Sequence, residues 1–305
     1  KITATVSSRI SPSRDHALSN RQIAPWLYFG EGSVCLQDAN SLIMRPEELA
    51  EMLQYLRETI PGIRWITSYA RSRTLARRTL EQLVMLRQAG LDRIHIGMES
   101  GYDPVLSFME KGSTAAEHIK AGCLVKEASI SLSEYVMPGL GGKLWWREHA
   151  LATADVLNQI NADFIRLRSL RVPKSAPLSE KIETGEMELL DDDGVVREIR
   201  LFIEHLDGIT STVASDHIMN LFEELSGTLP DDKEKMLSVA DRDLALPEKE
   251  RLIYKVGRWG GAYRSLDDLE DSVLRAKIEN VIDQWNVEAT GQVDEMIKEM
   301  ADQYI

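Results

Sequence analysis

The sequence predicts an α/β fold in which strands and helices alternate through the first 180 residues. Runs rich in β-branched and aromatic residues begin 30, 29, 38 and 33 residues apart, and helical patterns fill the intervals. Helices between consecutive strands imply parallel strands joined by right-handed crossovers. An open doubly wound sheet and a barrel of parallel strands both have this arrangement, and both build their sites at the carboxyl ends of the strands.

The strand candidates are each bounded by Gly, Pro, Asn or Asp: Ser33–Asp38, Ile63–Ser68, Asp92–Gly97, Ile130–Met137 and Asp163–Ser169, with Ile2–Val6 as a sixth. Pro46–Ile60 predicts a helix, because a first-turn proline and two glutamates precede apolar residues at helical spacing. Thr79–Ala89 repeats this pattern and ends at Gly90. No G-x-G-x-x-G motif follows the strand at Ser33–Asp38, so a nucleotide-binding open sheet loses support.

The rest of the chain is acidic and predicted to be helical. Residues 1–180 carry a net charge of +3 and residues 181–305 a net charge of −16. We divide the chain into a barrel at 1–185 and an acidic, mostly helical C-terminal extension at 186–305, near the turn Asp191–Gly194. The acidic excess repels nucleic-acid backbones, so we expect no duplex binding. The helix candidates of the extension are Val195–Leu206, His217–Leu225, Asp231–Ala240, Glu248–Val256, Leu266–Trp285 and Val287–Tyr304.

The two cysteines predict a protein of a reducing compartment rather than a secreted disulfide scaffold. The sequence has no apolar run of about 18 residues and no secretory signal pattern in its first thirty residues, so we expect a cytoplasmic protein without membrane association. Cys35 and Cys123 are expected to be small core residues. His95 lies in a predicted strand and is expected to be a hydrogen-bonded core histidine. The histidines in helical patterns are expected at the surface: His118, His149 and His205.

Polar residues follow the predicted strands at the edge where a parallel sheet builds its site. Gln37, Asp38 and Asn40 lie at the end of the first of the five strands, where a carboxylate can bind an ammonium or hydroxyl group or cap a helix. Arg71 and Arg73 follow the next strand and either converge on an anion or pair with helix carboxylates. Both sets are therefore candidate ligand contacts with an ordinary structural alternative.

The last three strands add further candidates. Glu99 follows an apolar strand body, where a half-buried carboxylate is costly unless a cation, an amine or hydroxyl groups meet it. A glycine-rich turn at Gly139–Gly142 allows the backbone to approach a ligand closely. Arg166 and Arg168 share one face of an otherwise apolar strand, which suggests either an anion site or structural salt bridges.

Five segments, taken together, resemble the consecutive strand-loop segments of radical S-adenosylmethionine (SAM) enzymes of the Elp3/MiaB/NifB type. The resemblance covers about residues 26–180 and implies a partial (β/α)6 barrel of the TIM type, in agreement with the six strand candidates. The stretch SDHIMNLFEELSGTLPDDKEKML resembles the helical extension of the same branch. The five segments are LQDANSLIMRPEEL, SYARSRTL, AGLDRIHIGMESGYDPVL, LSEYVMPGLGG and DFIRLRSLRVPKSAPL.

The resemblance implies an enzyme that cleaves SAM reductively with a [4Fe–4S] cluster, forming a 5′-deoxyadenosyl radical that abstracts hydrogen from a small-molecule or unknown substrate. It also implies an electron donor such as a flavodoxin or ferredoxin. No residue is assigned as catalytic. The positions that match SAM contacts are Gln37, Asp38, Asn40, Glu99, Ser100, Met137, Pro138, Gly139 and Arg168. The candidates for a carboxylate- or phosphate-bearing substrate are Tyr69, Arg71, Arg73 and Arg166.

The sequence departs from this family at its defining element, a C-x3-C-x2-C loop whose three thiolates hold the cluster. Its two cysteines lie 88 positions apart. We expect the cluster cysteines in a loop that these 305 residues lack, with Ser7–Asp15 as the place of the join. The alternative is a cluster-free barrel that binds SAM or another ligand without radical catalysis. A conventional barrel lyase or aldolase that uses Glu99 or a lysine is a third hypothesis. Few lysines follow the strands, which disfavours Schiff-base chemistry.

Overall fold

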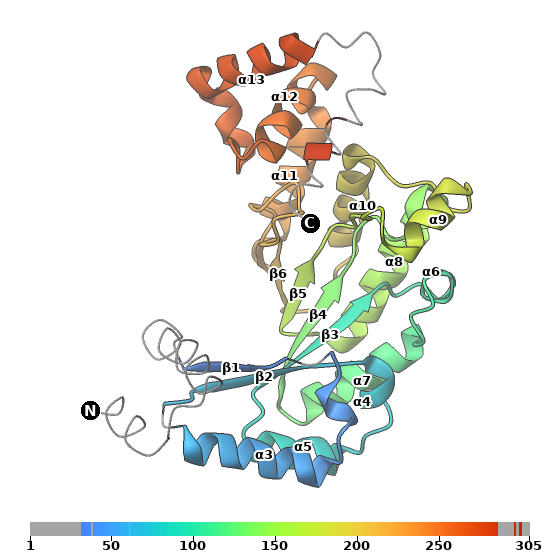
Figure 1. Ribbon diagram of the computed structural model, residues 1–305, viewed down its shortest axis with the longest axis vertical. Helices are drawn as coiled ribbons and strands as arrows, with labels where there is room; N and C mark the ends of the chain where they lie inside the picture. The colour runs from blue at the N-terminus through green and yellow to red at the C-terminus, as the bar shows by residue number, and fades with distance from the viewer. Residues whose placement is uncertain (1–31, 38, 61, 286–295, 297–298, 301–305) are drawn as a thin grey trace, which may run out of the picture.

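The computed structural model describes residues 32–37, 39–60, 62–285, 296 and 299–300. In this part of the chain seven strands form one sheet in sequential order, with β1–β6 parallel and β7 antiparallel to β6 (Figure 1). The strands are β1 (Ser33–Leu36), β2 (Trp65–Ala70), β3 (Arg93–Glu99), β4 (Ser131–Val136), β5 (Phe164–Leu167), β6 (Thr212–Ala214) and β7 (Gly227–Thr228).

Helices connect the strands, and three of them begin with clear local signals. Pro46 opens the helix after β1, with Glu47 and Glu48 in its first turn. Thr79 and Thr114 cap the helices before β3 and β4, each in a reciprocal capping box. The helices are η1 (Ser41–Ile43), α3 (Pro46–Thr59), α4 (Ser72–Leu75), α5 (Leu80–Gln88), α6 (Asp103–Phe108), α7 (Ala115–Glu127), α8 (Gly142–Ile160), α9 (Pro177–Glu183), α10 (Asp192–Glu204), α11 (Lys233–Ala245), α12 (Glu248–Trp259), η2 (Leu266–Glu270) and α13 (Ser272–Trp285).

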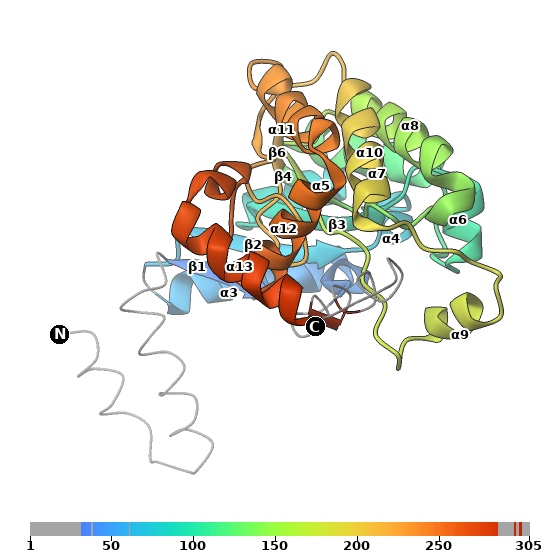
Figure 2. The same ribbon diagram turned by 90° about the horizontal axis from the view of Figure 1, so that it is seen from above.

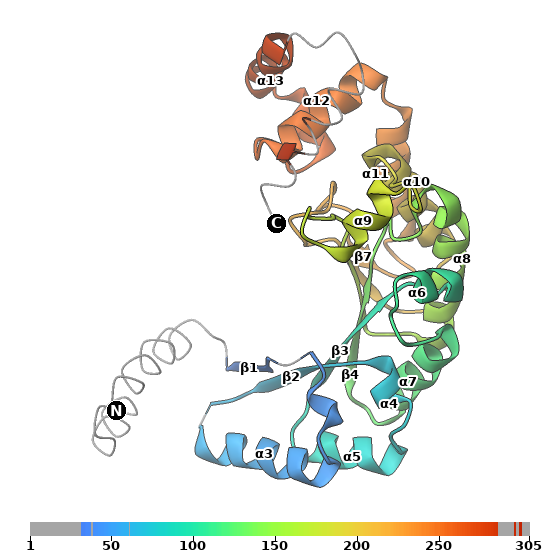
Figure 3. The ribbon, with the colours of Figure 1, turned by 45° about the vertical axis from the view of Figure 1, so that its right-hand side comes forward.

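The strand order distinguishes a barrel from a doubly wound sheet. A doubly wound sheet reverses its order at a switch point and carries helices on both faces, whereas an unreversed order places every right-handed crossover on the same face. Figure 3 shows α3, α5, α7 and α8 along one face of the curved sheet. Among the described residues β1 and β7 are the edges, so the barrel is open. The predicted α/β partial barrel is confirmed.

The two faces of the sheet differ in chemistry because side chains alternate along each strand. The face covered by helices is mostly apolar, and Ile66, Ile94 and Leu132 on it have no exposed surface, although the buried Glu134 of β4 lies on it too. The concave face carries polar and aromatic side chains, including His95 and Tyr135. Burial of the apolar side chains against the helices stabilises the sheet. The concave face is not covered by helices in the described part of the chain and is accessible to a ligand.

Most predicted strands and helices are present, and the exceptions have physical reasons. Ile2–Val6 lies outside the described residues, and the sixth parallel strand in the described part is β6. A strand of three residues is too short to show periodicity. His217–Leu225 was predicted to be a helix and forms turns instead. The guanidinium group of Arg258 is buried under these turns and donates to the carbonyls of Ile218, Asn220 and Leu221.

The first helix of the acidic part belongs to the barrel wall. Helix α10 packs against α8 (Figure 2), and it stands in the crossover from β5 to β6. Helices α12 and α13 pack together beyond the carboxyl edge of the sheet (Figure 1). The division at residues 185/186 stays a prediction, and the sheet itself continues to Thr228. Of the predicted helix Val287–Tyr304, only residues 296, 299 and 300 are described.

None of the helices in the described part of the chain combines the length and the apolar character that crossing a membrane requires.

Two aspartates fasten neighbouring strands where the strands begin. Asp92, just before β3, accepts hydrogen bonds from the Ile66 amide at 2.7 Å and from Arg57 and Arg87 at 2.7 and 2.9 Å. Asp163, just before β5, accepts from the Leu132 amide at 2.7 Å. Each carboxylate therefore ties the start of one strand to the preceding strand.

Asp92→Ala is expected to lower the free energy of unfolding by about 3–4 kcal/mol, because it leaves a buried amide and two cations without their acceptor. Asp163→Ala is the matched control and is expected to cost about half as much, since the Asp163 side chain is 37% exposed against 9% for Asp92. Urea unfolding of both variants measures the difference. Equal losses would contradict the assigned role of Asp92.

Candidate ligand-binding site

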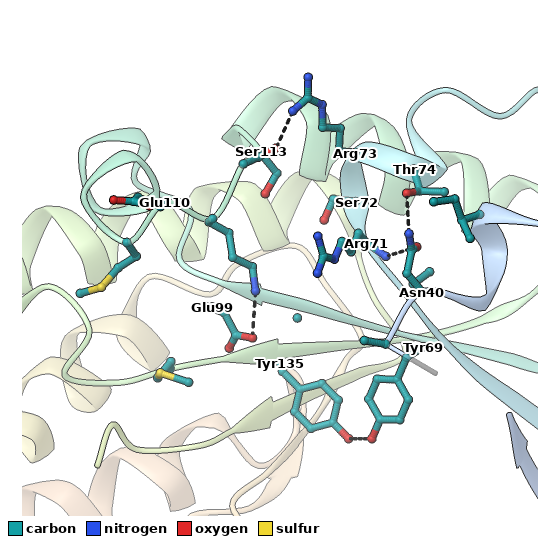
Figure 4. Close-up of a pocket in the computed structure, with 18 of the residues that line it drawn as sticks. Asn40, Tyr69, Arg71, Ser72, Arg73, Thr74, Glu99, Glu110, Ser113 and Tyr135 are labelled. Atoms are coloured by element: carbon teal, nitrogen blue, oxygen red, sulfur yellow. Dashed lines mark hydrogen bonds and ion pairs between the residues drawn. The ribbon is translucent and has the colours of Figure 1, made fainter. Parts of the chain in front are cut away.

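A cavity of about 860 Å³ opens at the carboxyl ends of β2–β5. Its walls come from the ends of these strands, from α4 and from the loop between α6 and α7 (Figure 4). Five basic and two acidic side chains line it: Arg71, Arg73, Arg77, Lys111 and Arg168, with Glu99 and Glu110. The cavity lies where a parallel barrel builds its site, and its walls carry both charges.

Glu99 has a strained backbone that directs its side chain into the cavity. Its φ is +64°, in the left-handed region, and the pairing of β3 with β4 shifts between Gly97 and Glu99. Lys111 Nζ donates to Glu99 Oε1 at 3.2 Å, and Oε2 forms no hydrogen bond within the described part of the chain. A strained non-glycine residue costs about 1–3 kcal/mol and occurs preferentially at functional positions.

Gly97 provides the space in which the Glu99 carboxylate lies. A Cβ atom on Gly97 would stand 2.4 Å from Glu99 Oε1 and 3.3 Å from Lys111 Nζ. A larger residue at position 97 would therefore push the carboxylate out of its place.

A buried histidine and a buried glutamate support the backbone of Glu99 from behind. His149 Nε2 lies 3.2 Å from the Glu99 carbonyl oxygen, and His149 Nδ1 lies 2.9 Å from Glu198 Oε1. The same Oε1 accepts from the Gly139 amide at 2.9 Å. His149 is only 1% exposed, so its predicted surface position is wrong. Helix α8 turns this residue toward the strand ends, on the face that carries the buried Ala150, Ala154 and Leu157, so the helical spacing of these apolar residues was a signal for its burial.

Aromatic rings form the cavity wall on the concave side of the sheet. The hydroxyl groups of Tyr69 and Tyr135 lie 3.4 Å apart, and this hydrogen bond, together with burial, raises the pKa of Tyr69 to about 12. The Arg168 guanidinium lies 4.7 Å from the centre of the Tyr135 ring. The Tyr69 phenol is therefore neutral at physiological pH, and both rings offer planar stacking surfaces to a ligand.

His95 lies next to these rings and is uncharged at neutral pH. Burial lowers the pKa of His95 to about 4, and the charges of Arg93, Arg166 and Arg168 add to this effect. Its Nδ1 atom is buried without a hydrogen-bond partner in the described part of the chain. His95 was predicted to be a hydrogen-bonded core residue. It is half-buried instead, and its Nδ1 has no hydrogen-bond partner among the described residues.

Asn40 and a serine–histidine–serine array hold the opposite wall. Asn40 Oδ1 accepts from the Arg71 amide and its Nδ2 donates to Thr74, both at 3.0 Å. His118 Nδ1 is hydrogen-bonded to the Ser72 hydroxyl, and its Nε2 lies 3.1 Å from the Ser113 hydroxyl. These bonds connect α4 to the loop before α7. His118 is 1% exposed, so its predicted surface position is also wrong.

Seven of the residues predicted from the sequence line the cavity: Asn40, Tyr69, Arg71, Arg73, Glu99, Met137 and Arg168. Gln37 is exposed outside it, and Asp38 lies outside the described residues. Ser100, Pro138 and Gly139 are buried behind its wall. Arg166 pairs with Asp216 at 2.8 Å, as its structural alternative predicted. Arg71, Arg73 and Arg168 form no ion pair with any carboxylate of the described residues.

Several lining residues were not predicted from the sequence, because most of them lie outside the strand ends. Lys111 and Ser113 belong to the loop between α6 and α7, and Ser72 and Arg77 belong to α4 and its C-terminal end. Tyr135 lies within β4. Successive strand residues face opposite sides of the sheet, so the buried apolar Val136 indicates that the neighbouring Tyr135 faces the concave side.

The residues present do not fit a [4Fe–4S] cluster. Such a cluster takes three or four thiolates, and the 305 residues contain two cysteines. Both are free and exposed, so their predicted core positions are wrong; Cys35 stands on the edge strand β1 and Cys123 on the outer side of α7. No three His, Cys, Asp or Glu side chains come together as a metal site anywhere in the described ranges.

The fold defines an α/β partial barrel with a cavity at the carboxyl edge of its sheet. No protein-family model matches the chain. An uncharacterized protein of Methanocaldococcus jannaschii is 26% identical over 113 residues, which are 37% of this chain and 34% of that protein. A tRNA uridine(34) acetyltransferase of the same organism is 29% identical over 62 residues, 20% of this chain and 12% of that enzyme. The matches thus span about a third or less of these curated relatives.

Three solved structures have a similar fold. They are archaeal Elp3 of Methanocaldococcus infernus (TM-score 0.49, 15% identity, 65% of this chain and 52% of that chain), the radical SAM methyltransferase TsrM of Kitasatospora setae (0.42, 14%, 84% and 53%) and the hydrogenase maturase HydG (0.46, 11%, 93% and 73%). These likenesses concern the fold alone. Since every TM-score is below 0.5, no ligand or reaction is carried over from these structures.

Acid is expected to destabilise the protein through His118. Burial, aided by the charge of Lys111, lowers the pKa of His118 to about 4 from 6.5. The unfolded chain therefore binds this proton at higher pH than the folded chain, and stability falls as the pH drops from about 6.5 toward 4. In the variant His118→Gln, the free energy of unfolding is expected to fall by about 2–3 kcal/mol less than in the wild type over this pH range. Urea unfolding between pH 4 and pH 7 measures it.

His205→Gln, a change at an exposed histidine, serves as the control and is expected to keep the wild-type pH dependence. Identical pH dependence of wild type and His118→Gln would contradict the role of His118.

Proposed function

We propose that the cavity binds SAM, as the sequence resemblance suggests. SAM carries an ammonium group, a sulfonium centre, a carboxylate and an adenine ring. The cavity offers the Glu99 carboxylate to the cationic groups and tyrosine rings to the base. It offers the ligand carboxylate the arginines that form no ion pair within the described residues. The observation that carries the proposal is Glu99, whose strained backbone directs the carboxylate into the cavity and whose Oε2 forms no hydrogen bond with any described residue.

We further propose that the protein belongs to the general radical SAM class of enzymes, as the five sequence segments that resemble this family suggest. Reductive cleavage of SAM requires a cluster for which these 305 residues do not provide the thiolates. The part of the function that this chain can perform with its own residues is therefore to bind and orient the ligand. The predicted flavodoxin or ferredoxin donor, the small-molecule substrate and the cytoplasmic location stay predictions.

The proposal is tested by titrating SAM into the chain and measuring the heat of binding. Glu99→Gln is expected to raise the Kd at least about tenfold, because a charge-assisted hydrogen bond is worth about 1.5–3 kcal/mol. Glu51→Gln, at an exposed position of α3, is expected to bind as the wild type does. Equal affinity of wild type and Glu99→Gln, or no binding by the wild type at 1 mM SAM, would refute the assignment.

A further inference from the structure

His149 and Glu198 lie outside the cavity and form a buried hydrogen-bond network. The network includes backbone groups at the end of β3 and in the turn after β4. The Glu99 carbonyl oxygen accepts the Met137 amide at 3.0 Å and lies 3.2 Å from His149 Nε2. Glu198 Oε1 accepts the Gly139 amide at 2.9 Å and lies 2.9 Å from His149 Nδ1. The network thus connects the end of β3, the turn after β4, α8 and α10.

The protonation of this network follows from its contacts. A carbonyl oxygen only accepts, so His149 Nε2 must carry a hydrogen. A second proton must then lie between Nδ1 and Glu198 Oε1, either on the ring or on the carboxyl group. The two side chains are 1% and 2% exposed, so water does not replace a missing partner. The pair is neutral as a whole in both arrangements.

The network also holds two backbone conformations with positive φ, of which only the one at the non-glycine residue Glu99 is strained. Glu99 has φ +64° and Gly139 has φ +88°, and the network bonds a backbone group of each residue. Strained conformations persist only where the surrounding structure over-determines them. The Glu99 carboxylate therefore depends on His149 and Glu198 for its direction, although neither side chain lines the cavity.

We propose that His149 and Glu198 are positioning residues, which hold the wall formed by Glu99 and Met137 through one shared proton. The inference rests on the proposed function, since it assigns them to the same ligand site. It also makes α10, which lies beyond the predicted boundary at residue 185, a part of that site.

Glu198→Gln tests the network because a neutral amide cannot satisfy all its contacts. When the amide oxygen accepts from Gly139, the same oxygen faces the Nδ1 lone pair of a neutral His149. When the amide group is reversed, it donates to Nδ1 and leaves the Gly139 amide unpaired. The variant is therefore expected to shift the backbone amide resonances of Glu99 and Gly139 and to weaken SAM binding about fivefold or more. Glu204→Gln, at an exposed position of the same helix, is expected to do neither.

Nitrogen-15 NMR of the His149 ring tests the network in the wild-type chain without any ligand, and it applies even where a variant fails to fold. The expected spectrum shows a hydrogen on Nε2. A wild-type spectrum with an unprotonated Nε2 would overturn the inference, as would unmoved Glu99 and Gly139 amides in Glu198→Gln, or wild-type affinity for SAM in that variant. Absence of SAM binding by the wild type would instead refute the proposed function, while the ring and amide signals still report on the network.

Discussion

Parallel pairing of β1 through β6 in an unreversed order is the constraint on which the rest of the molecule depends. Each strand must be followed by a crossover to the same face, so the helices collect on that face and bury its apolar side chains. The other face has no covering layer of helices in the described part and carries tyrosine, histidine and arginine. The same pairing brings the carboxyl ends of the strands to one edge, where the cavity lies.

The site combines local strain with rigid support. Glu99 stands in a left-handed conformation that only a few surrounding features make possible: the missing side chain at Gly97, the ion pair with Lys111, and the buried pair of His149 and Glu198. Such strain lowers stability by about 1–3 kcal/mol, and the core burial elsewhere in the barrel offsets it. The arrangement exposes one carboxylate oxygen to the cavity in a fixed direction, which suits recognition of a cationic ligand group.

The sequence predicted the repeating elements well because they depend on local signals. Capping residues and apolar spacing locate α3 and α5, and flanking turn residues locate β1–β5 to within a few residues. The environments of single side chains were predicted less well, since they depend on which face of an element meets a distant neighbour. His118 and His149 are buried by contacts 46 and 49 residues away in sequence. Cys35 is exposed because it lies on the concave face, opposite Thr67, and not on the helix-covered face of β1.

The site was predicted in part for the same reason. The sequence indicates where strands end, so Glu99, Tyr69 and Arg168 were predicted, whereas Lys111 belongs to a loop that only the fold brings to the cavity.

Our central claim is that the ligand binds in this cavity. Hydrogen–deuterium exchange of the chain with and without SAM tests that claim directly. SAM should slow exchange at residues 69–77, 97–99 and 109–113 and leave α12 and α13 unchanged. Slowed exchange confined to α12 and α13, or none at the cavity segments under saturating SAM, would contradict it.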